Sequence, residues 1–162
     1  MQLDDGGNKA IKDYRYKILI VDDEPDTAIT YKLVLEQNSQ FSVNAFADPL
    51  VALHSFSASM YDLLLVNVKM PKMDGIQLCK KIREIDNRVK ICFVTAQVNC
   101  KVALKNYYRY LHVSRVIQKP IENQELLKAV TYELENNKNN NTNYIEIQGK
   151  LKDKSFNKAE FT

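Results

Sequence analysis

Ile18-Leu19-Ile20-Val21, followed directly by Asp22-Asp23-Glu24-Pro25, is the stretch of the chain that decides its fold. Four consecutive apolar residues that stop at acidic residues and a proline are typical of a short strand buried on both faces. Similar apolar runs stand at 63–66 and 89–94, and a more polar strand is expected at 113–118. Strands buried on both faces indicate a parallel sheet that helices cover on either side.

The segments between these runs have the apolar spacing of helices, and Asp48-Pro49 has the residue types of a helix start. Helices are expected over 26–37, 49–56, 76–85, 99–108 and 122–134, and a half-exposed edge strand over 41–45. Crossovers between parallel strands are right-handed and return over the sheet. The alternation therefore predicts a doubly wound α/β domain with a five-stranded parallel sheet over residues 17–136.

The segments on either side of this domain are polar. Residues 1–16 contain Gly6-Gly7 and are expected to form a flexible leader, and residues 137–162 begin with an asparagine-rich run and are expected to form a linker and tail. The tail is too short for a core of its own, so a winged-helix output domain is not expected there. Its lysines alternate with acidic residues, which favours a solvated tail over nucleic-acid binding.

The composition is that of an ordinary globular domain. The 162 residues are 45% hydrophobic and 27% charged, with a net charge of +3, which indicates no polyanionic partner. No apolar run approaches the roughly 20 residues that cross a bilayer. The three cysteines lack the spacing of metal ligands, so reduced thiols in a cytoplasmic protein are expected.

Polar side chains follow the predicted strands at their carboxyl ends. Asp22 and Asp23 follow the first strand, Asn67 the third, Thr95 the fourth and Lys119 the fifth. Ligands of open parallel sheets bind at this edge, so two carboxylates, an amide, a hydroxyl and an ammonium are expected in one cleft. Taken alone, the two carboxylates would also suit a helix start.

These groups suit a metal ion and a phosphoryl group. Paired carboxylates hold Mg²⁺, while the hydroxyl of Thr95 and the ammonium of Lys119 can contact phosphoryl oxygens. An aspartate at position 67 could attack a phosphoryl donor, whereas the amide of Asn67 is not a usable nucleophile. Asn67 could instead be a structural cap for the loop that follows.

Over residues 17–136 the chain resembles the receiver domains of response regulators. Several short motifs in the order and at the intervals of that family carry the resemblance: Val21-Asp22-Asp23-Glu24-Pro25, Tyr61-Asp62-Leu63-Leu64-Leu65-Val66-Asn67, Met70-Pro71, Asp74-Gly75, Val94-Thr95-Ala96 and Lys119-Pro120. Each motif is a weak signal alone, but together they are specific. The resemblance implies a flavodoxin-like strand order of 2-1-3-4-5.

The resemblance also implies a phosphorylation site. In the family that the chain resembles, a partner histidine kinase phosphorylates an aspartate at the position that Asn67 occupies here. Mg²⁺ is held there by residues that match Asp22, Asp23, the acceptor and the backbone carbonyl of Lys69.

A switching surface is implied as well. Residues that match Thr95 and Lys119 sense the phosphoryl group and reshape the surface of the fourth helix and fifth strand. Tyr107, Tyr108 and Tyr110 lie near this surface. The aromatic cluster could be a docking patch for the output partner or could cover the edge of the core.

Two departures from the family bear on function. Asn67 stands at the acceptor position, so phosphorylation is not expected there. Weak Mg²⁺ binding is expected, because one carboxylate is lost while the side-chain oxygen of Asn67 can still coordinate. Val116 stands three residues before Lys119, where the family usually has Tyr or Phe, so the hydroxyl of Thr95 has no aromatic partner.

The sequence therefore predicts a single-domain receiver module of two-component phosphorelay signalling that is not an enzyme and is not phosphorylated as it stands. Asn67 is then either an engineered inactivation or the mark of a natural pseudo-receiver, a phosphorylation-independent adaptor for protein interactions. The expected partner is a histidine kinase or another signalling protein, with no membrane and no nucleic acid.

Two rival classes need features that the chain lacks. Phosphohydrolases of the haloacid dehalogenase type place an Asp-x-Asp pair after the first strand, where this chain has Asp22-Asp23-Glu24. Flavodoxin-like cofactor binding needs a hydroxyl- and glycine-rich phosphate loop where this chain has Glu24-Pro25-Asp26.

Overall fold

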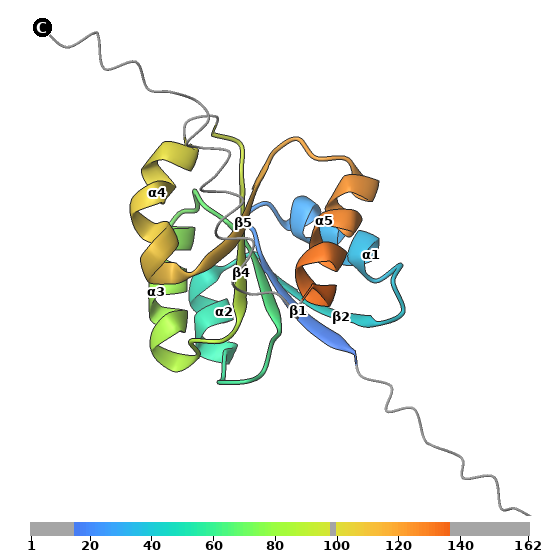
Figure 1. Ribbon diagram of the computed structural model, residues 1–162, viewed down its shortest axis with the longest axis horizontal. Coiled ribbons are helices and arrows are strands. Elements are labelled where there is room, and N and C mark those ends of the chain that lie inside the picture. The colour runs from blue at the N-terminus through green and yellow to red at the C-terminus, as the bar shows by residue number, and fades with distance from the viewer. Residues whose placement is uncertain (1–14, 98–99, 137–162) are drawn as a thin grey trace, which may run out of the picture.

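The computed structural model describes residues 15–97 and 100–136, without the side chains of 100–103, and strands and helices alternate through these residues (Figure 1). The strands are β1 (Tyr16–Val21), β2 (Phe41–Phe46), β3 (Leu63–Asn67), β4 (Lys90–Thr95) and β5 (Val113–Gln118). The helices are α1 (Pro25–Leu35), α2 (Pro49–Ser55), α3 (Gly75–Ile85), α4 (Cys100–Leu111) and α5 (Asn123–Glu135). Nearly all of the expected leader 1–16 and the whole expected tail 137–162 lie outside the described residues.

The strands form one parallel sheet in the order β2-β1-β3-β4-β5. The predicted doubly wound fold and its flavodoxin-like strand order are confirmed. The chain runs outward from β1 to β2 and then returns to β3, so the strand order reverses beside β1 and β3. Sheets of this kind bind ligands at the carboxyl ends of the strands, next to such a reversal.

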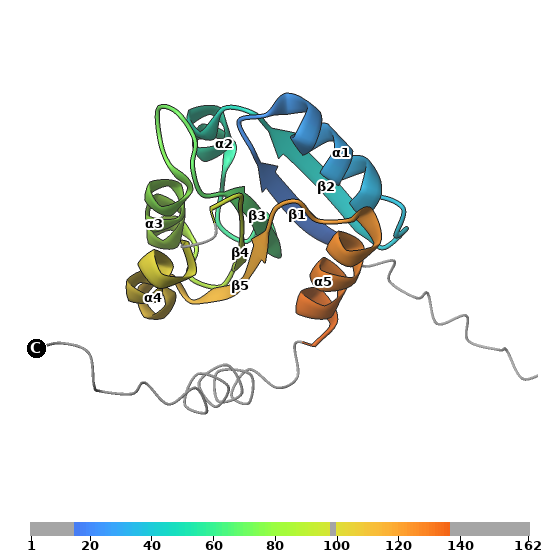
Figure 2. The same cartoon turned by 90° about the horizontal axis from the view of Figure 1, so that it is seen from above.

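Different helices cover the two faces of the sheet. α1 and α5 lie on one face and α2, α3 and α4 on the other (Figures 1 and 2). Because successive side chains of a strand point to opposite faces, neighbours in β3 belong to different cores. Leu64 packs with Phe93 beneath α2, α3 and α4, whereas Leu65 packs with Leu126 beneath α1 and α5. This two-sided burial explains the uninterrupted apolar runs of the sequence.

The observed element boundaries lie close to the predicted ones, with local differences. β1 begins at Tyr16, inside the segment expected as leader. α1 begins at Pro25, because proline lacks an N–H group and its fixed φ suits the first helical position. α4 continues to Leu111 instead of ending at Tyr108, because the buried side chain of Leu111 completes the core on that face.

Some apolar residues that follow the helical spacing are exposed. Ile29 and Leu33 of α1 are 53% and 61% exposed, because the sheet takes only the opposite side of this helix. In α5 the apolar spacing predicts Leu127 as a core residue, but Leu126 is fully buried and Leu127 only partly buried. None of the described helices combines the length and apolar character that a bilayer crossing requires.

Candidate functional site

The predicted site residues lie at one edge of the sheet. Asp22 directly follows β1, Asn67 ends β3, Thr95 ends β4 and Lys119 directly follows β5. The strands are parallel and in register, with Asn67 beside Val94 of the neighbouring strand. Their carboxyl ends therefore meet at the same edge, as the sequence predicted.

An ion pair joins the carboxyl ends of β1 and β5 at this edge. The ammonium of Lys119 donates to Oδ2 of Asp22 at 2.7 Å, and Asp22 is only 2% exposed. The backbone N–H of Glu24 donates to the other carboxylate oxygen of Asp22 at 3.0 Å. Asp22 thus has a donor on each oxygen, which a buried carboxylate requires.

Negative charge accumulates around the end of β1. Burial first, and then the charges of Asp22 and Glu24, raise the pKa of Tyr31 on α1. The phenol is therefore neutral at physiological pH.

Asn67 bridges two segments through its side-chain nitrogen. Nδ2 donates to Oδ1 of Asp23 at 2.8 Å and to the backbone carbonyl of Lys69 at 3.1 Å. The reverse orientation of the amide would turn its oxygen toward two other oxygens, so the contacts themselves fix the orientation. The side-chain nitrogen, and not the oxygen that was expected to coordinate Mg²⁺, therefore contacts both partners.

Gly75 explains the Asp74-Gly75 motif after β3. A Cβ atom on Gly75 would lie 2.3 Å from the backbone oxygen of Asn67, and only a residue without a side chain fits this approach. Asp74 starts α3 with a reciprocal capping box, in which it accepts from the N–H of Gln77 at 2.8 Å. The sequence identified Asp74-Gly75 as a motif of the resemblance, but the close approach of Gly75 to Asn67 could not be predicted from it.

Thr95 is buried at 2% exposure, and its hydroxyl oxygen accepts from the N–H of Gln97 at 3.1 Å. The backbone carbonyl of Thr95 accepts from the N–H of Lys119 at 2.8 Å, which ties the ends of β4 and β5 together. Val116 of β5 packs partly buried against the core beneath α2, α3 and α4. The predicted sensing residues are therefore adjacent to each other.

The residues expected to ligate Mg²⁺ gather here, but their arrangement does not fit a divalent cation. Asp23 and the carbonyl of Lys69 already accept from Asn67, and Asp22 accepts from Lys119. The expected ligand set has only two carboxylates, and within the described ranges no third His, Cys, Asp or Glu side chain joins them as a metal-binding group. The side chains of Asn67 and Lys119 thus already donate to oxygen atoms that a cation would need.

The tyrosines of α4 divide into two kinds. Tyr107 and Tyr108 are partly buried and pack against the core, and the ammonium of Lys80 lies 4.7 Å from the ring centre of Tyr107. Tyr110 is 62% exposed. Two members of the cluster thus cover the core edge, and the third is largely exposed.

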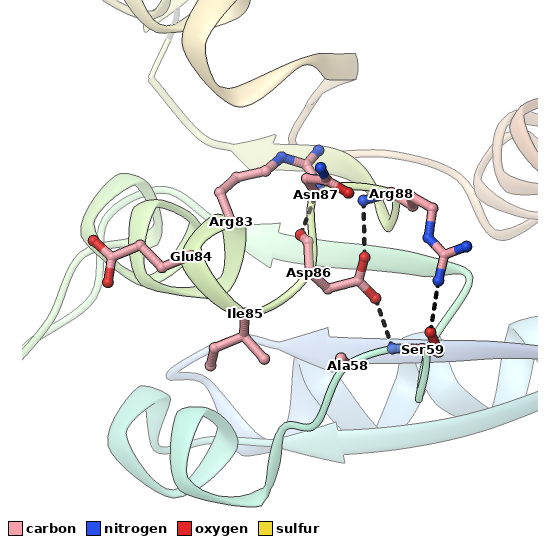
Figure 3. Close-up of a pocket in the computed structure, with 8 residues that line it drawn as sticks. All are labelled: Ala58, Ser59, Arg83, Glu84, Ile85, Asp86, Asn87 and Arg88. Atoms are coloured by element: carbon pink, nitrogen blue, oxygen red, sulfur yellow. Dashed lines mark hydrogen bonds between the residues drawn. The ribbon is translucent and has the colours of Figure 1, made fainter.

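Two hollows at the opposite edge of the sheet share no residue with this site. One, of about 250 Å³, lies between the loop before β3 and the loop before β4 (Figure 3). Another, of about 540 Å³, lies beside it and includes Tyr16 and Leu134. Both belong to the amino ends of the strands, away from the groups with phosphate or metal chemistry.

Asp86 is the polar residue at these hollows that sequence reasoning missed. It is 6% exposed and accepts from the N–H groups of Ser59 and Arg88 at 2.8 Å each and of Val89 at 3.3 Å (Figure 3). Asp86 joins two loops, and no sequence motif indicates this role. A polar residue directly after a predicted helix is too common to be a signal.

The comparisons with known proteins agree with the fold and the motifs. The family model of the response regulator receiver domain matches residues 18–131. The sensor protein EvgS of Escherichia coli (strain K12) is 38% identical over 82 residues, which cover 51% of this chain and 7% of EvgS. The response regulator ArlR of Staphylococcus saprophyticus is 31% identical over 140 residues, which cover 85% of this chain and 60% of ArlR. The chain thus spans only part of the length of these relatives.

A solved structure of a sensor protein has a similar fold. A sensor protein from Polaromonas sp. JS666 superposes with a TM-score of 0.65 at 27% identity, covering 75% of this chain and 98% of that chain. The family match covers β1 through most of α5, and the observed strand order is the one that the motifs implied. This chain belongs to the response regulator receiver domain family.

Proposed function

We propose that the chain is a receiver module of two-component signalling that is not phosphorylated at residue 67 and acts through protein contacts. The chemistry of Asn67 carries this proposal. Its side chain stands at the end of β3, where the family has its acceptor, and its nitrogen donates to Asp23 and to the carbonyl of Lys69. The lone pair of an amide nitrogen is delocalised into its carbonyl group, so this nitrogen is not a nucleophile for phosphorus.

We propose no catalytic role for the receiver pocket, the group of Asp22, Asp23, Asn67, Thr95 and Lys119 at the carboxyl ends of the strands. The ammonium of Lys119 is engaged by Asp22, and the hydroxyl of Thr95 is buried and accepts from Gln97. Neither arrangement is a nucleophile beside a free general base. A generic phosphate ester should show no turnover, and the purified protein should be colourless, because no phosphate loop for a flavin follows β1.

The proposed partner is a histidine kinase or another signalling protein in the cytoplasm, and the proposed output surface is that of α4 and β5. Tyr110 is the exposed aromatic side chain of that surface. Tyrosine suits an interface anchor because it offers a large rigid contact area with a polar tip. EvgS is a sensor protein and ArlR a response regulator, which supports a signalling partner.

Acetyl phosphate tests the central claim. The protein is incubated with acetyl phosphate and Mg²⁺, and its intact mass is measured. We expect no added phosphoryl group on the present chain and one on an Asn67→Asp variant. The variant serves as the positive control for the assay conditions. A phosphoryl adduct on the present chain, mapped to any residue of the pocket, would contradict the proposal.

The codon for residue 67 in the source genome separates the two versions of this function. An asparagine codon supports the natural pseudo-receiver, and an aspartate codon supports an engineered inactivation of a phosphorylated receiver. Val116 favours natural divergence, because a single inactivating substitution at position 67 would leave the aromatic residue of β5 in place.

A further inference from the structure

We infer that the side-chain amide of Asn67 replaces the divalent cation of the receiver pocket, so that the pocket is closed and stable without metal. The inference rests on the proposed function in one respect, since it assigns the acceptor position to Asn67. It adds a physical role for that residue beyond the loss of a phosphorylation site.

The geometry of the amide nitrogen resembles that of a bridging cation. One atom, Nδ2, contacts Oδ1 of Asp23 at 2.8 Å and the backbone oxygen of Lys69 at 3.1 Å. Asp23 belongs to the loop after β1 and Lys69 to the loop after β3. The two hydrogens of a single nitrogen therefore tie together two loops that a metal ion would otherwise join.

Both carboxylates of the pocket have a donor within this chain, without an added ion. Asp22 is paired with the ammonium of Lys119, and Asp23 receives a hydrogen bond from Asn67. An aspartate at position 67 would instead add a third carboxylate beside these two and remove the donor. Like charges held this close favour uptake of a cation, whereas the present arrangement has each carboxylate already satisfied.

Entry of Mg²⁺ would require the amide to turn over. A Mg²⁺ ion in the place of Nδ2 would need Oδ1 of Asp23 and the backbone oxygen of Lys69 at about 2.1 Å. These oxygens now lie 2.8 Å and 3.1 Å from Nδ2, so both would have to move closer. Both hydrogen bonds of Asn67 would be lost, and its side-chain oxygen would have to face inward. The asparagine thus competes directly with the cation for the same acceptors.

Thermal unfolding with and without millimolar MgCl₂, against KCl of equal ionic strength, tests this inference. For the present chain we expect a Tm change below about 1 °C, because a ligand stabilises a protein only when it is present well above its Kd. For Asn67→Asp we expect a lower Tm without Mg²⁺ and a clear rise with it. Asn67→Ala should lower the Tm, because it removes both hydrogen bonds.

Asn87→Asp is the matched control, because it adds the same charge at an exposed position on the opposite edge of the sheet. It should show no Mg²⁺ response. A Tm rise of the present chain as large as that of Asn67→Asp would overturn the inference. An Asn67→Ala variant as stable as the present chain would overturn it as well.

A measurement on the unaltered chain covers the case in which the variants do not fold. In ¹⁵N-labelled protein, both side-chain amide protons of Asn67 should exchange slowly with solvent, and micromolar Mn²⁺ should leave their signals unbroadened. Selective broadening around Asp23 and Asn67 would overturn the inference. This readout does not depend on phosphorylation, so its failure and the failure of the acetyl phosphate experiment are distinguishable.

Discussion

Gly75 illustrates how a single residue constrains the pocket. Its absent Cβ would lie 2.3 Å from the backbone oxygen of Asn67 and 3.0 Å from the side chain of Val66. The backbone on both sides of this contact is held, since Gly75 donates to the carbonyl of Val68, and Val68 donates to that of Val94. The obstacle is therefore backbone that belongs to the sheet, which cannot give way as a flexible side chain can.

We predict that Gly75→Ala lowers the free energy of unfolding by about 1–3 kcal/mol, because an added methyl group must displace held backbone. Urea denaturation followed by circular dichroism measures the change. Glu84→Ala on the exposed side of the same helix is the control and should stay within about 0.5 kcal/mol of the parent protein. A Gly75→Ala protein as stable as its control would show that the end of β3 can shift.

The sequence could predict only those contacts of the site that follow from the positions of the strand ends. Asp22 and Lys119 could be placed together from the sequence, because the carboxyl ends of parallel strands share one edge. The contact of Asn67 with the carbonyl of Lys69 could not be foreseen, since it depends on the path of the loop after β3. Because the path of this loop was unknown, the side-chain oxygen of Asn67, and not its nitrogen, was expected to face the metal position.

At the scale of elements, the carboxylate of Asp86 joins the loops that precede β3 and β4. Burial alone would raise the pKa of Asp86. The N–H groups of Arg88, Ser59 and Val89, together with the charge of Arg88, outweigh that effect, so the pKa lies below its ordinary value. A lowered pKa in the folded state means that the ionised carboxylate stabilises the fold.

We predict that Asp86→Asn lowers the free energy of unfolding at pH 7 by about 1–3 kcal/mol, because fewer acceptor sites remain for the buried N–H groups. The parent protein has the full contribution of Asp86 above the unfolded-state pKa of about 3.9 and loses it as the pH falls through the lower folded-state value. The stability difference between the two proteins should therefore shrink below about pH 4.

Urea denaturation across acid pH, with Glu84→Gln as the control, measures this effect. Glu84 is an exposed carboxylate two residues before Asp86, so its substitution tests charge removal without the loop contacts. A stability difference that stays constant into acid would mean that Asp86 acts through its shape and not its charge.

Element types were more predictable than element faces. β3 and β4 followed from uninterrupted apolar runs, because both of their faces are buried. In α5 the apolar spacing predicted Leu127 as a core residue, whereas tertiary packing buries Leu126 fully and Leu127 only in part. Apolar periodicity locates a helix, but a stripe as broad as this one leaves its rotation open by about one residue.

At the scale of the whole molecule, two cores share one sheet. Leu64 and Leu65 are adjacent in β3, are at most 1% exposed, and lie in different cores. Since every strand contributes to both faces, neither core can be lost while the other stays intact. The domain should therefore unfold as one cooperative unit.

We predict that Leu64→Ala and Leu65→Ala each lower the free energy of unfolding by about 2–5 kcal/mol, as cavities in packed cores do. Urea denaturation should give coincident transitions by circular dichroism and tyrosine fluorescence for both variants. Ser42→Ala, an exposed position on β2, is the control. Separate transitions in either variant would mean that one face can melt before the other.

The ion pair between Lys119 and Asp22 joins residues that are 97 positions apart, at the ends of β1 and β5. These two strands are not neighbours, because β3 and β4 lie between them. During synthesis from the amino end, Asp22 is made early, and almost the entire domain is synthesised before Lys119 is added. A nascent or truncated chain that stops before β5 therefore carries Asp22 without its counter-charge, and only the finished sheet can close the pocket.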